Sequence, residues 1–211
     1  DNVIENMKFK LGSYKSFLEE YIDEIIVIFS GKTMDGKSLN DFVEKCTKGS
    51  YREIDAENRR IRELLKKRPH NIRSLKCALQ DFERVYELLV EYDIPEQNKW
   101  LFSFIAYTFS ARAGLVIKDK EYESIFYDDD VSQLYPGYYS KKYMIDGIKK
   151  WISDGEWNEE AINCQMSFMK ERYTAITSLD KARINSILDL EEEDMLAGYP
   201  ELLNLAYEGK L

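Results

Sequence analysis

Apolar side chains recur at intervals of three and four residues from residue 72 to residue 89. The positions concerned are Ile72, Leu75, Leu79, Phe82, Tyr86 and Leu89. This spacing follows the helical period of about 3.6 residues, so it predicts a long amphipathic helix from Ile72 to about Tyr92 whose apolar stripe packs on a core. Asn71 stands at the N-cap position, where its side chain accepts a hydrogen bond from a free amide of the first turn.

Helical spacing also predicts most of the remaining elements. Further helices are expected over residues 11–24, 52–67, 141–153 and 158–178, and a last pair of helices over residues 179–207. Pro95 precedes the apolar run WLFSFIAYTF, residues 100–109. That run is too short to cross a bilayer, which takes about 20 helical residues, so it predicts a helix that is buried on all sides. We therefore expect an all-α, multi-helix array.

Two features of this organisation stay open. The run EIIVIFS, residues 24–30, fits either a buried strand or a continuing helix, so one short strand or hairpin near residues 24–34 is an alternative. The chain forms either an N-terminal lobe, residues 1–93, and a C-terminal lobe, residues 94–211, or one continuous domain. The acidic run 191–194 is interpreted as the first turn of a helix, where the helix dipole favours carboxylates.

The composition, with 44% hydrophobic and 33% charged residues, is that of an ordinary globular protein. The net charge of −9 argues against non-specific binding to nucleic acid or to an anionic membrane. Cys46, Cys77 and Cys164 are far apart in the sequence, which indicates reduced thiols in the cytoplasm and gives no reason to expect a metal. Because the chain starts at Asp1 and lacks a signal peptide, we expect a cytoplasmic fragment of a longer protein.

Directly after EIIVIFS, residues 31–38 read GKTMDGKS, which matches the phosphate-binding pattern G-x-x-x-x-G-K-[ST]. The residues of such a site would be Gly31, Gly36, Lys37 and Ser38. The lysine would neutralise a terminal phosphate and the serine would bind Mg²⁺. However, Asp35 places a carboxylate in a loop meant for anions, and strands do not alternate with helices as a parallel nucleotide-binding sheet requires. A turn around Asp35-Gly36 is the simpler interpretation.

Basic residues gather between residues 59 and 76, although the whole chain is acidic. For residues 52–67 the simplest interpretation is a solvated helix face flanked by glutamates. Arg73 and Lys76 differ, because they lie in the first turns of the helix predicted from Ile72. Cations there oppose the helix dipole unless an anion or an acidic partner is present, so both a phosphate contact and a salt bridge to a neighbouring helix stay open.

The sequence NIRSLK, residues 71–76, followed by Leu79 and Phe82, resembles the N-x-R-x-L-K start of the helical region that follows the nucleotide-binding core in KAP-type and related AAA-like P-loop NTPases. Some members of that broad group are associated with bacterial defence against phage. The resemblance covers roughly residues 20–92. It implies a helical lid in which Arg73 is a sensor-like residue that faces the nucleotide phosphates, with Lys76 as its neighbour.

The resemblance also implies where the chemistry lies. The chain lacks a nucleotide-binding core of its own, so the core, with its ATP and Mg²⁺, would belong to another part of the same protein or to another protein. This chain would then have no catalytic residue, no cofactor and no metal. The resemblance does not extend to residues 95–211.

Tyrosines gather around the sequence YPG, in the least regular part of the chain. Tyr135, Tyr138 and Tyr139 are expected to be exposed there and to contact a protein partner, because the acidic residues 128–130 nearby disfavour nucleic acid. The acidic residues do not form a calcium loop, because Gln133 stands where a glycine is needed. His70 is the only histidine, which excludes histidine-based triads and multi-histidine metal sites.

Three functions follow from these observations. The leading hypothesis is a non-catalytic lid or effector-coupling module of a larger P-loop NTPase, in which Arg73 stabilises phosphate charge. The second is a free-standing helical protein-interaction module. The third is a self-contained nucleotide-binding enzyme that uses the loop 31–38, and it requires a strand at residues 24–30. None of the three involves a membrane, and nucleic acid is not an expected partner.

Overall fold

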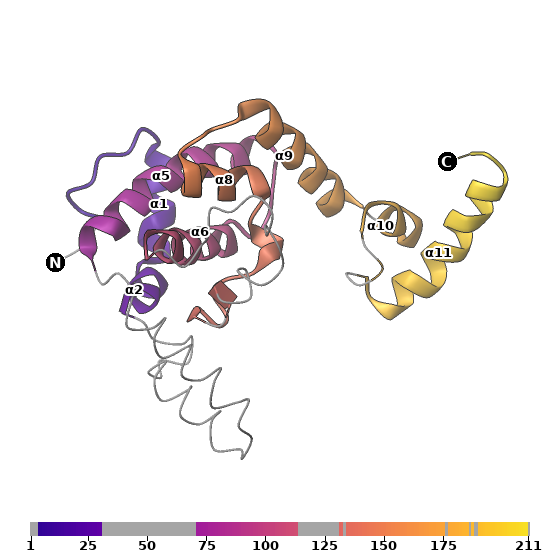
Figure 1. The fold of residues 1–211 in the computed structure, drawn as a ribbon, viewed down its shortest axis with the longest axis horizontal. Helices are drawn as coiled ribbons and strands as arrows, with labels where there is room; N and C mark the ends of the chain where they lie inside the picture. Colours follow the sequence, from indigo (N-terminus) through magenta and orange to yellow (C-terminus); the bar gives the residue numbers. More distant parts are fainter. Residues whose placement is uncertain are drawn as a thin grey trace, which may run out of the picture.

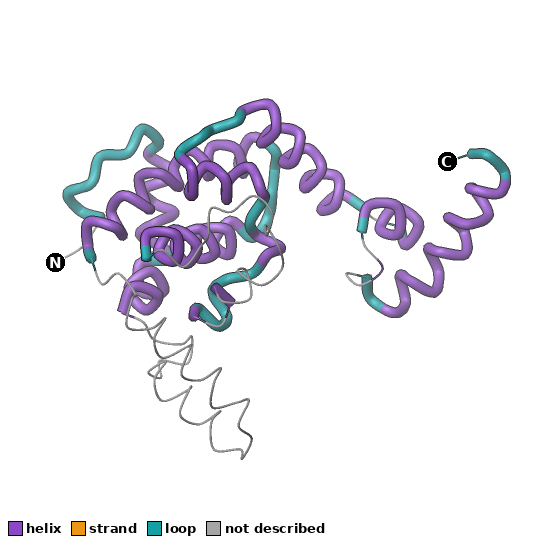
Figure 2. Tube along the Cα trace, viewed as in Figure 1, coloured by secondary structure: helices purple, strands orange, loops and turns teal. Residues whose placement is uncertain are grey.

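The computed structural model describes residues 4–30, 71–113, 131–132, 134–175, 177–185, 187 and 190–210. Within these ranges the chain forms eight α-helices and one short 3-10 helix, without a strand (Figure 2). The expectation of an all-α fold is therefore confirmed. None of the described helices is long and apolar enough to cross a membrane.

The segment that fitted both a strand and a helix is helical. α1 spans Gly12–Glu20 and α2 spans Ile22–Ser30, and Tyr21 between them divides the single helix that was predicted over residues 11–24. Ile25 and Ile28 of α2 are fully buried and three residues apart, so one face of this helix enters the core. The β-branched residues thus meet the core at helical rather than alternating positions, and no strand forms between residues 4 and 30.

α5 (Ile72–Glu91) carries the apolar stripe that the sequence predicted. The side chain of Asn71 accepts a hydrogen bond from the amide of Arg73 at 2.8 Å, which confirms the N-cap. The stripe is buried from Leu75 to Leu89, whereas Ile72, in the first turn, is 45% exposed.

α6 (Gln97–Arg112) is buried on every side, as its apolar run predicted. Its residues from Trp100 to Ser110 are all buried. Figure 1 shows α6 at the centre of the bundle, and it packs against α2, α5 and α8 (Asp146–Asp154). A helix without a polar face suits this central position, because neighbouring helices cover its whole circumference.

The helices after the tyrosine-rich stretch are shorter than expected. The 3-10 helix η1 (Lys141–Tyr143) and α8 replace the single helix predicted over residues 141–153, and α9 (Glu159–Thr174) ends before residue 178. α8 and α9 approach each other at Gly147, where a Cβ atom would lie 2.6 Å from Cγ1 of Ile162. Only glycine permits this approach without displacing the isoleucine.

The turn between α5 and α6 has an unusual backbone. Asp93 and Glu96 have φ angles of 54° and 56°, a region that is unfavourable for residues other than glycine. Glu96 is held there by side-chain contacts: it accepts a hydrogen bond from the hydroxyl of Tyr143 at 2.9 Å and pairs with Lys99 and Lys142. These contacts join the start of α6 to η1.

One buried cluster runs through the bundle from Ile4 to Met169 and joins residues of α1, α2 and α5 to residues of α6, α8 and α9. The described core therefore crosses the boundary that was considered near residue 93. α5 and α6, on the two sides of that boundary, pack directly on each other.

The last two helices form a separate hairpin. α10 (Ser178–Ile184) and α11 (Glu192–Tyr207) pack mainly on each other, and Figure 1 shows them extending away from the bundle beyond the end of α9. Glu192, Glu193 and Asp194 lie in the first turn of α11, as the acidic run predicted.

Candidate functional site

Outside the described residues lie the four candidate phosphate-loop residues, Gly31, Gly36, Lys37 and Ser38. The helix expected over residues 52–67 and His70 also lie there. The segment that immediately precedes the loop is α2, a helix. A P-loop follows a buried strand, so the described structure does not supply the element on which such a loop depends.

Arg73 and Lys76 lie where the sequence placed them, in the first turns of α5 and one turn apart. Arg73 is exposed and Lys76 is half-buried. Neither side chain has an ion-pair partner in the part of the chain that the structure describes. The phosphate contact expected for these two residues stays a prediction.

Tyr135, Tyr138 and Tyr139 are buried, and this corrects the expectation that they are exposed. Tyr138 meets the ring of Phe102 edge-on, and Tyr139 stacks on Tyr107, so both contact α6. The physical reason is the composition of α6, which is apolar on every side and needs a cover where no helix lies. The stretch around YPG supplies that cover, so its tyrosines do not offer a surface to a partner.

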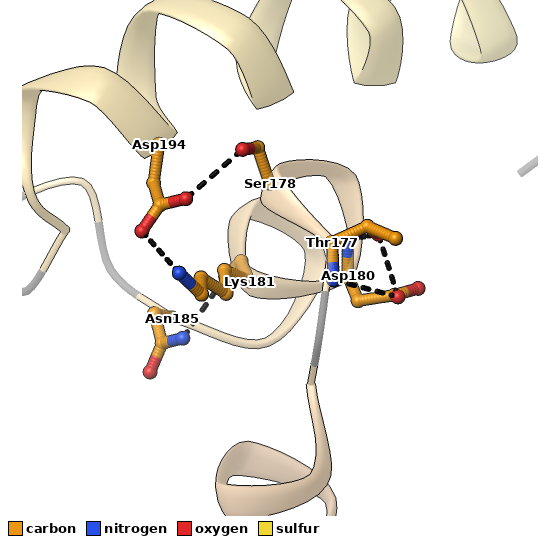
Figure 3. A network of polar contacts seen from close by, with 6 residues as sticks. All are labelled: Thr177, Ser178, Asp180, Lys181, Asn185 and Asp194. Carbon is orange, nitrogen blue, oxygen red and sulfur yellow. Dashed lines mark hydrogen bonds and ion pairs between the residues drawn. The ribbon is translucent and has the colours of Figure 1, made fainter.

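The α10–α11 hairpin contains a network of polar contacts (Figure 3). Thr177 and Asp180 form a capping box at the start of α10. From α11, the carboxylate of Asp194 accepts hydrogen bonds from the hydroxyl of Ser178 at 2.9 Å and from the ammonium group of Lys181 at 2.5 Å. Asp194 thereby ties the first turn of α11 to the first turn of α10.

These contacts are favourable at neutral pH. The hydrogen bond from Lys181, with a second from Ser178, holds the pKa of Asp194 below its usual value. The hydroxyl of Thr177, together with its backbone amide, likewise lowers the pKa of Asp180. Both carboxylates are therefore charged under ordinary conditions, and their contacts weaken only when acid protonates them.

The two helices approach closely at Gly198 of α11. A Cβ atom there would lie 2.1 Å from the carbonyl oxygen of Ser178 and 2.9 Å from the Cβ atom of Ala182, so no other residue fits. The far end of α10 is attached to α9, because Nε of Arg172 donates a hydrogen bond to Oδ1 of Asn185 at 2.7 Å. The hairpin is thus fixed internally and joined to the helix that leads to it.

α11 carries large apolar side chains on a second face, opposite Gly198. Leu196, Leu203 and Tyr207 are 64%, 56% and 88% exposed, and Pro200 is exposed as well. These four residues are four, three and four positions apart, so they form one line along the helix. We call them the α11 stripe. The face that includes Gly198 holds the half-buried residues Met195, Tyr199, Leu202 and Leu205.

Acidic residues border the α11 stripe. Glu192 and Glu193 flank its N-terminal end, and Glu201 and Glu208 lie along one side, all four exposed. α11 contains neither lysine nor arginine, and Lys210, just beyond it, pairs with Glu208 at 2.8 Å. The exposed side of the hairpin therefore combines an apolar line with negative charge.

A hollow of about 490 Å³ lies where α9 meets α10. It is lined by Phe168, Glu171, Asp180, Arg183 and Ile184, among others. Phe168 is 47% exposed, so the surface around the hairpin contains further apolar area.

Exposed apolar side chains and carboxylates make up this surface. In the described ranges no three histidine, cysteine, aspartate or glutamate side chains lie close enough together to hold a metal ion. The α11 stripe was missed in the sequence, although a signal exists: positions 196, 200, 203 and 207 form a second apolar line beside 195, 199, 202 and 205. One hairpin partner covers only one of the two lines.

Comparisons of the chain with protein families, with curated proteins and with solved structures find no match. The function is therefore inferred from the geometry.

Proposed function

We propose that this chain is a helical protein-interaction module and that the α11 stripe is its docking face. The observation that carries the proposal is the exposure of Leu196, Leu203 and Tyr207 on one side of α11. Removing one such side chain from water is worth about 1.5–3 kcal/mol, so three in one line provide a strong driving force for association. Contiguous exposed apolar surface of this kind marks interaction sites.

The partner that fits this face is a helix with an apolar ridge flanked by lysine or arginine. Apolar residues at intervals of four, three and four are the pattern with which helices pack on each other. The glutamates beside the stripe attract a basic partner and repel an acidic one. These charges act at contact range, because salt screens them beyond about 8 Å under physiological conditions.

The hairpin presents this face in a fixed conformation. Asp194 joins the two helices through Ser178 and Lys181, and the close approach at Gly198 sets their separation. A face that is already ordered loses less conformational entropy when a partner binds. This pre-organisation supports a docking function for the hairpin.

The proposal is tested by fluorescence anisotropy with two labelled amphipathic helical peptides, which share a leucine ridge and differ only in flanking lysine or glutamate. We expect the lysine peptide to bind and the glutamate peptide to bind much more weakly. Leu203→Ser should weaken the binding of the lysine peptide by about tenfold or more, because one apolar contact is lost. Val90→Ser is the matched control, since Val90 is 49% exposed and lies on α5 rather than on the hairpin.

Equal binding of the two peptides, or equal effects of Leu203→Ser and Val90→Ser, would contradict the proposal. Light scattering on the chain alone measures its oligomeric state and so tests whether a second copy of the chain occupies the face. A dimer that Leu203→Ser converts to a monomer would replace the basic partner by a second copy of this chain.

A second candidate function is the lid of a P-loop NTPase, and one observation favours it. Arg73 is exposed at the N-terminus of α5 and has no ion-pair partner among the described residues, so a phosphate has access to it. Calorimetry with ATP and Mg²⁺ tests this candidate on the wild type, Arg73→Ala and Lys37→Ala. Weak binding that only Arg73→Ala abolishes is expected for a lid. Tight binding that only Lys37→Ala abolishes would indicate a self-contained nucleotide-binding enzyme instead.

A further inference from the structure

A cavity of about 410 Å³ lies in the bundle, away from the α10–α11 hairpin. α5, α6 and α8 line it through Asp81, Phe104, Thr108, Arg112, Trp151 and Ser153. Its size lies within the range of about 300–1,000 Å³ that is common for small-molecule sites. No step of the proposed docking function uses this cavity.

The apolar part of the cavity is aromatic. The ring centroids of Phe104 and Trp151 lie 6.1 Å apart with an angle of 41° between the rings. Trp151 also packs against Trp157, and the centroids of these two rings lie 4.8 Å apart in an edge-on arrangement. The guanidinium group of Arg84 lies over the ring of Trp157. The walls are therefore fixed in place, and the ring of Trp151, which is partly exposed, is available to an aromatic ligand while the buried ring of Phe104 supports it.

Two opposite charges stand at the cavity. Nη2 of Arg112 and Oδ2 of Asp81 are 4.0 Å apart, and both side chains are partly exposed. This separation is longer than a hydrogen bond, so each group keeps its capacity to bind a ligand. Burial raises the pKa of Asp81, and the nearby charge of Arg112 opposes this shift.

A third polar group in the cavity wall lacks a partner. Thr108 is 3% exposed, and its hydroxyl forms no hydrogen bond with any part of the chain that is described. A buried hydroxyl without a partner is unfavourable, and a polar atom of a ligand would satisfy it.

We propose that this cavity binds a small zwitterion with an aromatic side chain, of the class of the free aromatic amino acids. The ammonium group of the ligand pairs with Asp81 and its carboxylate pairs with Arg112. Its ring packs against Trp151, and a polar substituent on the ring forms a hydrogen bond with the hydroxyl of Thr108. A ligand with only one of these charges forms only one of the two charged contacts.

The experiment is a titration of the full chain, followed by ligand-detected saturation-transfer NMR, with four probes. L-tyrosine carries all the recognised groups, L-phenylalanine lacks the hydroxyl, tyrosinamide lacks the carboxylate and N-acetyl-tyrosine lacks the ammonium group. We expect tyrosine to bind most tightly and phenylalanine less tightly. The two singly charged derivatives should bind at least about tenfold more weakly than tyrosine, because each lacks one charge-assisted hydrogen bond.

Variants assign the binding to this cavity. Arg112→Gln and Asp81→Asn should each weaken the binding of tyrosine by about tenfold or more, since each removes one charged contact. Thr108→Val has nearly the same shape as the wild type and should make tyrosine and phenylalanine bind equally. The matched controls are Lys150→Gln and Glu156→Gln, which remove the charges of an exposed ion pair with a separation of 3.0 Å outside the cavity. Neither control should change tyrosine binding.

Three results would overturn the proposal. The first is the absence of binding by all four probes to a folded wild-type chain. The second is equal binding of tyrosine, tyrosinamide and N-acetyl-tyrosine. The third is tyrosine binding that the cavity variants leave unchanged, or that the two control variants weaken equally. Thermal unfolding of each variant establishes whether it is folded. If Thr108→Val or Asp81→Asn does not fold, Arg112→Gln, at a partly exposed position, still tests the cavity.

Discussion

Glu83 lies on α5 with 8% of its surface exposed, and its partners come from the N-terminal segment. Its carboxylate accepts hydrogen bonds from the amides of Lys10 at 2.5 Å and Leu11 at 2.9 Å. Leu11 is the N-cap of α1 and has no capping side chain, so Glu83 satisfies that end from another helix. This contact could not be predicted from a local pattern, because 72 residues separate Glu83 from Leu11.

Replacing Glu83 by alanine should lower the free energy of unfolding by about 2–4 kcal/mol, because two amides lose their acceptor. Urea denaturation measures this change. Glu87→Ala, at an exposed position one turn further along α5, is the matched control and should cost about 0.5 kcal/mol or less. Equal losses in the two variants would show that the contacts of Glu83 do not stabilise the fold.

Tyr14 gives a second prediction at this scale. It is fully buried, and its hydroxyl donates a hydrogen bond to the carbonyl oxygen of Leu79 at 2.5 Å. Burial, followed by the nearby charge of Glu83, raises the pKa of Tyr14 far above its usual value of about 10. Above that pH the unfolded chain releases the phenol proton while the folded chain retains it, so stability falls as the pH rises.

Tyr14→Phe should remove this part of the alkaline loss, although it lowers stability at every pH by about 1 kcal/mol through the missing hydrogen bond. Urea denaturation from pH 8 to pH 11 gives the slope for the wild type and the variant. Tyr207→Phe, at a side chain that is 88% exposed, should keep the slope of the wild type. If Tyr14→Phe shows the same loss of stability with rising pH as the wild type, Tyr14 is not the source of that loss.

At the scale of the secondary-structure elements, apolar periodicity predicted two kinds of helix: helices with one face in the core, and helices that are buried on every side. α5 and α6 are the examples, because Leu75 to Leu89 and Trp100 to Ser110 are buried as expected. Periodicity was ambiguous for α2, whose apolar run is too dense to distinguish the two patterns. It also predicted α11 as a helix without showing which of its apolar faces packs on α10, since that depends on the close approach at Gly198.

Gly198→Ala should separate α10 from α11, because the added methyl group meets the backbone of Ser178 rather than a movable side chain. Overpacking costs about 1–3 kcal/mol in typical cores, and a backbone clash belongs at the upper end of that range. Hydrogen exchange should become faster in residues 178–207 and stay unchanged in α5 and α6. The same substitution at Gly12, where no atom lies within 4 Å, should leave exchange in the hairpin unchanged.

If Gly198→Ala keeps the exchange rates of the hairpin, the close approach does not hold the two helices together. If exchange rises equally in α5 and α6, the hairpin is not an independent unit.

At the scale of the whole molecule, the described chain consists of a bundle with one shared core and a hairpin beyond the end of α9 (Figure 1). The sequence located Arg73 and Lys76 correctly on α5, because their positions follow from one helix alone. It misplaced Tyr135, Tyr138 and Tyr139, because an irregular sequence was interpreted as an exposed one. The α11 stripe and the cavity of Asp81 and Arg112 depend on which helices meet, and periodicity does not contain that information.

The proposed docking face is tested most directly by hydrogen exchange of the chain with and without the lysine-flanked helical peptide. We predict slower exchange in residues 192–207 with this peptide and no change with its glutamate-flanked counterpart, and Leu203→Ser should abolish the protection. Protection of the α5–α6 region in place of α11, or unchanged exchange throughout at a saturating peptide concentration, would contradict a docking function for the α11 stripe.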